Sequence, residues 1–200
     1  MSIVLSEKES LFTLYTKTSM YQMKVDDYGV LLHTYYGKKT ENFDYSYLIQ
    51  RRDHGFSGNP YQAGNDRTYS LDTLPQEYSC FGSGDYRQSA LSVKYQTGAM
   101  ALELRYKDYE IQKGKYKIPG LPALYAMEEN QADTLVITMK DDVEDVCVKL
   151  YYGVLEDLDV ITRTVCVENR GSAPVFLERA MSLCLDRSYG SYDWITFYGK

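Results

Sequence analysis

The chain has 200 residues, of which 44% are hydrophobic and 25% are charged, values typical of a globular protein with a sizeable core. Its formal net charge is −6 and it has no basic run, which argues against nucleic acid as a partner because phosphate binding requires clustered Lys and Arg. The sequence also lacks a secretory signal at its N-terminus and a stretch approaching the roughly 18 apolar residues of a membrane span, so we expect a cytoplasmic protein without a membrane partner.

Most of the chain shows the alternation of apolar and polar residues, or the enrichment in β-branched and aromatic residues, that is typical of strands. In chain order, the predicted strands cover residues 11–16, 21–25, 30–36, 92–95, 101–111, 134–140, 146–154, 160–169, 175–185 and 194–198. In the strand at 146–154, Val146, Val148 and Leu150 share one face, which we expect to be buried, while Cys147 and Lys149 lie on the other. Only 45–50 and 124–130 resemble short helices. The pattern predicts an all-β fold, a large antiparallel β-sandwich in one domain.

A long polar, turn-rich loop at 53–91 interrupts the strands. Connections longer than about 12 to 15 residues without regular structure are often binding loops or lids. This loop is too aromatic for a disordered segment, since it contains Tyr61, Tyr69, Tyr78, Phe81 and Tyr86. Tyrosine is abundant in the whole chain, with 21 copies, and its flat face with a polar tip suits both half-wet strands and sugar binding.

Cysteine and histidine give no sign of a metal site or a cofactor. The cysteines are Cys80, Cys147, Cys166 and Cys184. They show neither a C-x-x-C motif nor a zinc-binding spacing with the two histidines, His33 and His54. Three of the cysteines fall in apolar strand patterns, which favours buried free thiols in a reducing compartment.

Catalytic motifs are equally scarce. His33 lies in an apolar and aromatic strand pattern and is interpreted as a structural residue on a sheet face. The segment at 82–85, Gly-Ser-Gly-Asp, resembles part of a phosphate-binding loop but lacks its lysine and helix, so we expect a tight turn that places Asp85 and Arg87. Glycoside hydrolysis requires a pair of nearby carboxylates, and the sequence alone selects none.

Asp53 is the most informative single carboxylate. It follows Arg51 and Arg52 and precedes the glycine-rich stretch at 54–60 that contains Phe56. A carboxylate beside an aromatic ring is a common way to hold sugar hydroxyls. The alternatives are an Asx turn or an ion pair with an arginine, and the sequence leaves all three open.

At these residues the chain resembles the N-terminal domain of microbial α-galactosidases of glycoside hydrolase family 36. The matching pieces are FTLYTKTSMYQMKV at 12–25, GVLLHTYYG at 29–37, RDHGFSGNP at 52–60, LPQEYSCFGSGDYR at 74–87, GLPALY at 120–125 and DLDVITRT at 157–164. The pieces at 52–60 and 74–87 are the most specific, and together the matches span nearly the whole chain.

This resemblance implies a β-supersandwich of the galactose-mutarotase type that precedes a (β/α)₈ barrel in a retaining α-galactosidase. Both catalytic aspartates of such enzymes lie in the barrel. Residues 1–200 would then be a domain incomplete at its C-terminal end, with no catalytic residue in this chain and no activity alone. The intact protein would be a cytoplasmic homotetramer that hydrolyses α-galactoside oligosaccharides without a cofactor.

The resemblance also implies one substrate contact. In tetrameric members the loop matching 51–66 reaches the active site of a neighbouring subunit, and the aspartate matching Asp53 contacts substrate there. Asp53 is therefore the predicted substrate-binding residue, with Phe56 and Arg67 as weaker predictions in the same loop. His54 occupies a variable position and receives no role.

Two other functions remain open at this point. The first is an autonomous carbohydrate-binding module in which Tyr61, Tyr69 and Tyr86 stack on sugar. The second is a sugar epimerase, which would need an acid–base pair in one cleft, such as His33 with a carboxylate.

Overall fold

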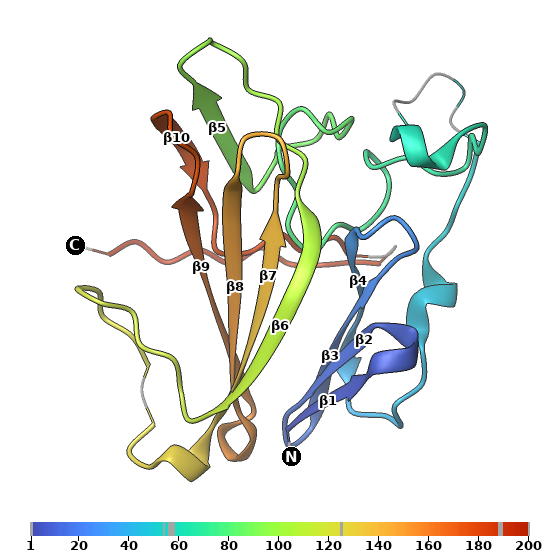
Figure 1. The fold of residues 1–200 in the computed structure, drawn as a ribbon. Helices are drawn as coiled ribbons and strands as arrows, with labels where there is room; N and C mark the ends of the chain where they lie inside the picture. Colours follow the sequence, from blue (N-terminus) through green and yellow to red (C-terminus); the bar gives the residue numbers. More distant parts are fainter. Residues whose placement is uncertain (1, 54, 56–58, 125, 188–189, 200) are drawn as a thin grey trace.

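The computed structural model describes residues 2–53, 55, 59–124, 126–187 and 190–199. In this part of the chain, two four-stranded antiparallel sheets and a smaller two-stranded sheet are joined by loops and short 3₁₀ turns (Figure 1). The prediction of an all-β antiparallel sandwich is confirmed. No helix among the described residues is long and apolar enough to cross a membrane.

The first sheet is built from the N-terminal strands in the order β1-β2-β3-β4. Its strands are β1 (Ile3–Ser6), β2 (Leu11–Tyr15), β3 (Ser19–Val25) and β4 (Leu31–Lys38). Phe12 pairs with Met23 across β2 and β3, and both side chains are buried. A bulge between Gln22 and Met23 shifts the register of β3 against β4.

The second sheet has the order β6-β7-β8-β9. Its strands are β6 (Arg105–Lys113), β7 (Asp133–Lys140), β8 (Val146–Leu155) and β9 (Val160–Asn169). Along β8, Val146, Val148 and Leu150 are buried on one face as predicted. Lys149 on the other face is partly exposed and forms an ion pair with Glu168 of β9 at 3.0 Å, so this face is only partly exposed to solvent.

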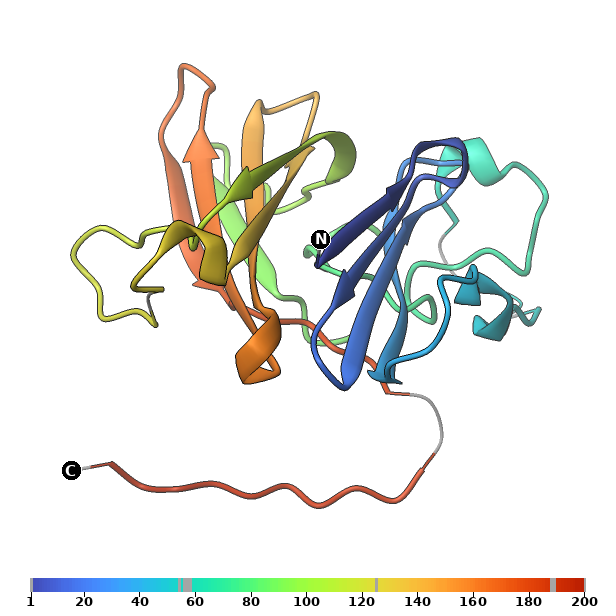
Figure 2. The same cartoon turned by 90° about the horizontal axis from the view of Figure 1, so that it is seen from below.

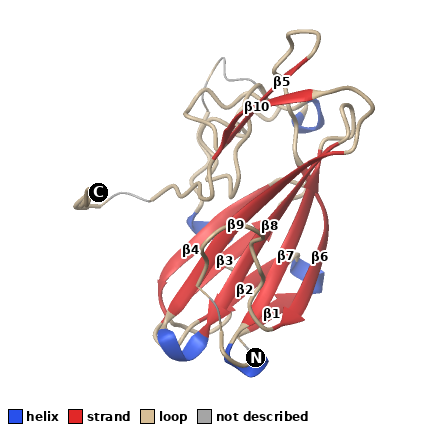
Figure 3. Cartoon of the chain, turned by 90° about the vertical axis from the view of Figure 1, so that its left-hand side faces the viewer, coloured by secondary structure: helices blue, strands red, loops and turns tan. Residues whose placement is uncertain are grey.

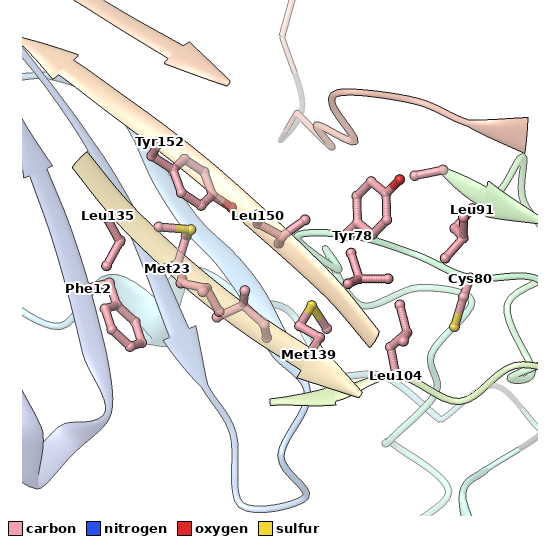
Figure 4. Close-up of a cluster of buried hydrophobic side chains, with 14 of the residues drawn as sticks. Phe12, Met23, Tyr78, Cys80, Leu91, Leu104, Leu135, Met139, Leu150 and Tyr152 are labelled. Carbon is pink, nitrogen blue, oxygen red and sulfur yellow. The ribbon is translucent and has the colours of Figure 1, made fainter. Parts of the chain in front are cut away.

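The two sheets face each other across one apolar core (Figure 2). Figure 4 shows Phe12 and Met23 of the first sheet close to Leu135, Leu150 and Tyr152 of the second. Each large apolar side chain that is fully buried contributes roughly 1.5–3 kcal/mol to stability. The alternation in each strand therefore determines which face turns inward, because a slip of one residue would expose the whole apolar set.

A two-stranded sheet of β5 (Leu91–Tyr95) and β10 (Val175–Ala180) lies beyond one end of the sandwich (Figure 3). The long connection between β4 and β5 contains two 3₁₀ turns, η2 (Tyr45–Leu48) and η3 (Tyr61–Ala63). The other turns of this kind are η1 (Glu7–Glu9), η4 (Glu129–Gln131) and η5 (Glu156–Leu158).

Several predicted elements differ from the structure. Strand β1 was not predicted, the predicted strand at 101–111 begins only at Arg105, and that at 175–185 ends at Ala180. Of the predicted helix at 124–130, only the last residues enter η4. The predicted strand at 194–198 is wrong for this structure: the segment forms no sheet pairing among the described residues, and Trp194 and Phe197 are exposed. A strand requires a neighbour for its backbone groups, which local alternation cannot supply.

All four cysteines are free, as predicted. Cys80 and Cys147 are buried and Cys184 is half-buried. Cys166 contradicts the expectation of a buried thiol, because it lies on the exposed face of β9 opposite Lys149.

Candidate functional site

Asp53 and Arg67 form an ion pair at the surface of the long loop. Arg67 Nη2 lies 3.1 Å from Asp53 Oδ1, and the side chains of Arg67 and Asp53 are 63% and 55% exposed. The backbone N–H of Gly55 also donates to Asp53 Oδ1, at 2.8 Å. The Asx turn and the arginine pair are therefore both present. Both of these interactions use Oδ1.

The segment that carries Arg67 is stiffened by local hydrogen bonds. Asn59 Nδ2 donates to the backbone oxygen of Asp66 at 2.7 Å, which ties the two sides of this segment together. Thr68 donates to Asp66 Oδ1 from Oγ1 at 2.6 Å and from its backbone N at 2.9 Å, and these bonds lower the pKa of Asp66. Arg67 is thus held in a short, ordered arm beside Asp53.

Tyr69 anchors the base of this loop to the sandwich. Its ring is buried edge-on against Tyr28 with 4.6 Å between centroids, and the guanidinium of Arg51 lies 5.4 Å from its centroid. Its hydroxyl donates to Asp26 Oδ2 at 2.6 Å, and burial raises the pKa of Tyr69. Asp26 is therefore part of the anchor.

A second, smaller apolar cluster attaches the long loop to the first sheet. It consists of Val30, Leu32, Ala63, Tyr69, Leu71 and Leu74. Because Leu31 belongs to the main core, its neighbours Val30 and Leu32 turn to the opposite face of the sheet. The loop packs on that outer face, which fixes where Asp53 and Arg67 emerge.

The other predicted residues have different outcomes. Phe56 and His54 lie outside the residues that the structure describes, so the prediction for Phe56 stays a prediction. Tyr69, named as a sugar-stacking ring in the binding-module alternative, cannot stack on a ligand because it is buried. Tyr61 and Tyr86 of the same set are exposed.

The turn predicted at 82–85 is confirmed. Gly82 has a φ of +90°, and a Cβ there would lie 2.6 Å from the backbone of Ala101, so only glycine fits. The turn buries Asp85, which accepts from Arg87 Nε at 2.9 Å and from Gln76 Nε2 at 2.8 Å. Arg87 also donates to the backbone oxygens at 71 and 74, so it fastens the end of the long loop.

A buried polar network centred on Glu77 lies between the sheets. Its carboxylate accepts from Tyr21 at 2.8 Å, from Tyr152 at 2.7 Å and from Arg163 Nη1 at 2.6 Å. Arg163 Nη2 also donates to the backbone oxygen of Glu77 at 2.9 Å. Burial raises the pKa of Glu77, and the charge of Arg163 acts against that rise. The network joins the loop end to β3, β8 and β9.

His33 lies beside this network. Its Nδ1 is 3.7 Å from Glu77 Oε2, and burial, followed by the charges of Arg187 and Arg163, lowers the pKa of His33 to about 4. The structure thus brings together the histidine and carboxylate that the epimerase alternative requires. The two side chains are only 7% and 0% exposed, however, and an acid–base pair must reach its substrate. His33 is a structural residue, as interpreted from the sequence.

The family assignment follows from the sequence profile of the glycosyl hydrolase family 36 N-terminal domain, which matches residues 29–200. The chain belongs to this family. The resemblance inferred from the motifs is therefore confirmed.

Individual relatives agree with the family 36 assignment. The chain is 50% identical over its whole length to "Bifunctional alpha-galactosidase/sucrose kinase AgaSK" of Mediterraneibacter gnavus, and 38% identical to "Alpha-galactosidase AgaA" of Geobacillus stearothermophilus. The solved galactosidase domain of AgaSK superposes with a TM-score of 0.88 over 92% of this chain and 25% of that one. The complex of Geobacillus stearothermophilus AgaA with raffinose superposes with a TM-score of 0.82 at 39% identity, over 86% of this chain and 24% of that one.

This family 36 domain spans only 21% of AgaSK and 27% of AgaA in sequence.

Sequence reasoning placed Asp53 and Arg67 in one loop, and the structure pairs them. The sequence did not predict the hydrogen bond of Tyr69 to Asp26 or the contact of Glu77 with Arg163, because the partners are far apart in the chain and no local motif marks them.

Proposed function

We propose that the chain is the N-terminal β-sandwich of a retaining α-galactosidase that hydrolyses terminal α-galactosyl residues of oligosaccharides. In this proposal the domain is not catalytic and serves as scaffold, as a source of oligomer contacts in a cytoplasmic homotetramer, and as part of the substrate entrance. The observation that carries the proposal is 50% identity over the whole chain to a relative named as an α-galactosidase. Structures of AgaA variants from Geobacillus stearothermophilus contain raffinose or stachyose, which supports an α-galactoside as the substrate.

Because the domain is proposed to be non-catalytic, we expect that the 200-residue chain alone does not hydrolyse a chromogenic α-galactoside, whereas the intact protein does. A retaining glycosidase needs two carboxyl groups about 5–5.5 Å apart that reach the sugar. A cavity between the two sheets in the described part of the chain is lined by a single carboxylate, Asp159. Turnover is measured with equal molar amounts of both proteins. Hydrolysis by the short chain that persists through successive purification steps would refute the proposal.

Asp53→Ala in the intact protein is expected to lower kcat/KM for raffinose about tenfold, which corresponds to about 1.4 kcal/mol and to one lost charge-assisted hydrogen bond. The thermal midpoint should change little, because Asp53 is more than half exposed.

Asp157→Ala is the matched control, since Asp157 is an exposed carboxylate of η5. It should leave kcat/KM unchanged. Equal kinetics of the Asp53 and Asp157 variants would remove Asp53 from the substrate entrance.

An autonomous carbohydrate-binding module is the alternative function, and the exposed rings of Tyr61 and Tyr86 favour it. Raffinose binding by the isolated chain that is lost on Tyr61→Ala would support this alternative over an entrance completed by other parts of an enzyme.

A further inference from the structure

A cavity of about 180 Å³ lies where the two sheets meet at the strands β3, β4, β8 and β9. The first sheet contributes Tyr21 and Tyr36, and the second contributes Tyr152 and Arg163. Leu183 and Leu185 complete the wall from the segment that follows β10. Figure 2 shows this part of the chain crossing from the second sheet to the first below the sandwich. The cavity is thus built by three separate regions of the sequence.

The walls combine ring surface with a few polar groups. Tyr36 is 41% exposed, and its ring lies 5.7 Å from that of Tyr21, so aromatic surface reaches the mouth. The leucines supply a second apolar wall. Ligand sites commonly combine such apolar walls with a small number of placed polar groups.

The polar groups of the cavity are organised before any ligand arrives. Tyr21, Tyr152 and Arg163 are fixed by their bonds to Glu77 beneath them. Arg163 Nε is buried and has no acceptor among the described residues. A buried donor without an acceptor is costly, and a ligand in the cavity would reach Nε only if the Arg163 side chain moved.

The charges around the cavity balance. Arg163 is paired with Glu77 at 2.6 Å. Hydrogen bonds from Thr16 and Thr18 lower the pKa of Asp159 to about 2, so this carboxylate is ionised. The guanidinium carbon of Arg187 lies 4.8 Å from the centroid of the Tyr36 ring. The two charged residues that line the cavity, Arg163 and Asp159, have opposite signs, which favours a neutral ligand over a charged one.

The size restricts the ligand further. At about 30 Å³ per water molecule, the cavity has room for roughly six waters. It is smaller than the roughly 300–1,000 Å³ of sites that enclose drug-sized molecules. A single small ring fits, while a disaccharide would extend into solvent.

From these observations we infer that this cavity is a binding site for a neutral monosaccharide. The C–H face of the sugar packs on the tyrosine and leucine walls, and a sugar hydroxyl donates to Asp159, the carboxylate that lines the cavity. This site is additional to the contact proposed for Asp53, and its binding does not depend on α-galactosidase activity.

The test is a titration of the ¹⁵N-labelled chain with D-galactose and D-glucose, followed by NMR. We expect shifts of backbone amides in β3, β4, β8 and β9 for at least one of the sugars, with a Kd on the order of 1 mM. Tyr36→Ala removes part of the aromatic wall and Leu183→Trp fills the cavity, and each should weaken binding at least fivefold. Tyr61→Ala, which removes an exposed ring of the long loop, is the control and should not change the affinity.

The inference is overturned if neither sugar shifts these amides, if the shifts are confined to the surroundings of Tyr61 and Tyr86, or if both cavity variants bind as tightly as the unchanged chain. Tighter binding of D-galacturonate than of D-galactose would overturn the neutral class. Because the titration involves no turnover, none of these results bears on the proposed α-galactosidase activity.

Discussion

Arg163→Met is expected to lower the free energy of unfolding by about 3–5 kcal/mol, because it leaves a buried carboxylate without its cationic partner. Glu77 is fully buried, and Arg163 Nη1 approaches it to 2.6 Å. Methionine keeps only the apolar base of the side chain, so the contacts of the guanidinium with the rings of Tyr78 and Tyr152 are lost together with the donors. The tyrosine hydroxyls still donate to Glu77, yet they carry no charge.

The measurement is equilibrium unfolding in urea by circular dichroism, with Arg170→Met as the matched control. Arg170 pairs with Glu168 at the surface, where such a pair contributes at most about 1 kcal/mol. Arg163→Met/Glu77→Met should recover part of the loss, since no buried charge remains. If Arg163→Met and Arg170→Met cost the same, the buried pair does not hold the sheets together.

The strands were predictable where one face of a strand packs on the core. In β8 the alternation of Val146 and Val148 with Lys149 determines which face is buried, and this requires no knowledge of the partner strand. The segment at 194–198 has the same kind of composition, but its large side chains have no sheet against which to pack. Composition shows that a segment can form a strand, while pairing depends on residues far away in the sequence.

The same contrast applies to the candidate site. The contacts of Asp53 with Gly55 and Arg67 lie within one loop, so the sequence already suggested an Asx turn and an arginine pair. Glu77 and Arg163 are 86 positions apart, and their contact exists only because β9 packs beside the end of the long loop. The cavity beside them combines three regions of the chain, and no single motif could have indicated it.

Arg87→Ala is expected to lower the free energy of unfolding by about 2–4 kcal/mol. The loss of a partner from a buried charge pair costs about 3–5 kcal/mol, and the smaller range applies because the side chain of Arg87 is 36% exposed while that of Asp85 is 1% exposed. The variant also removes the hydrogen bonds of Arg87 Nη2 to the backbone oxygens of Leu71 and Leu74, at 3.0 and 2.8 Å. Hydrogen exchange should therefore accelerate at 70–76 before it does so in β8.

Arg52→Ala separates this effect from the general loss of a cation. Arg52 is an exposed arginine whose guanidinium contacts Gln50, and its replacement should change stability by less than about 0.5 kcal/mol. Because the turn at 82–85 and the end of the long loop share Arg87, its loss should also weaken the hold on the segment that leads to Glu77. If exchange at 70–76 stayed as slow in Arg87→Ala as in Arg52→Ala, then Asp85 and Gln76 alone would fasten the loop, and Arg87 would contribute only charge balance.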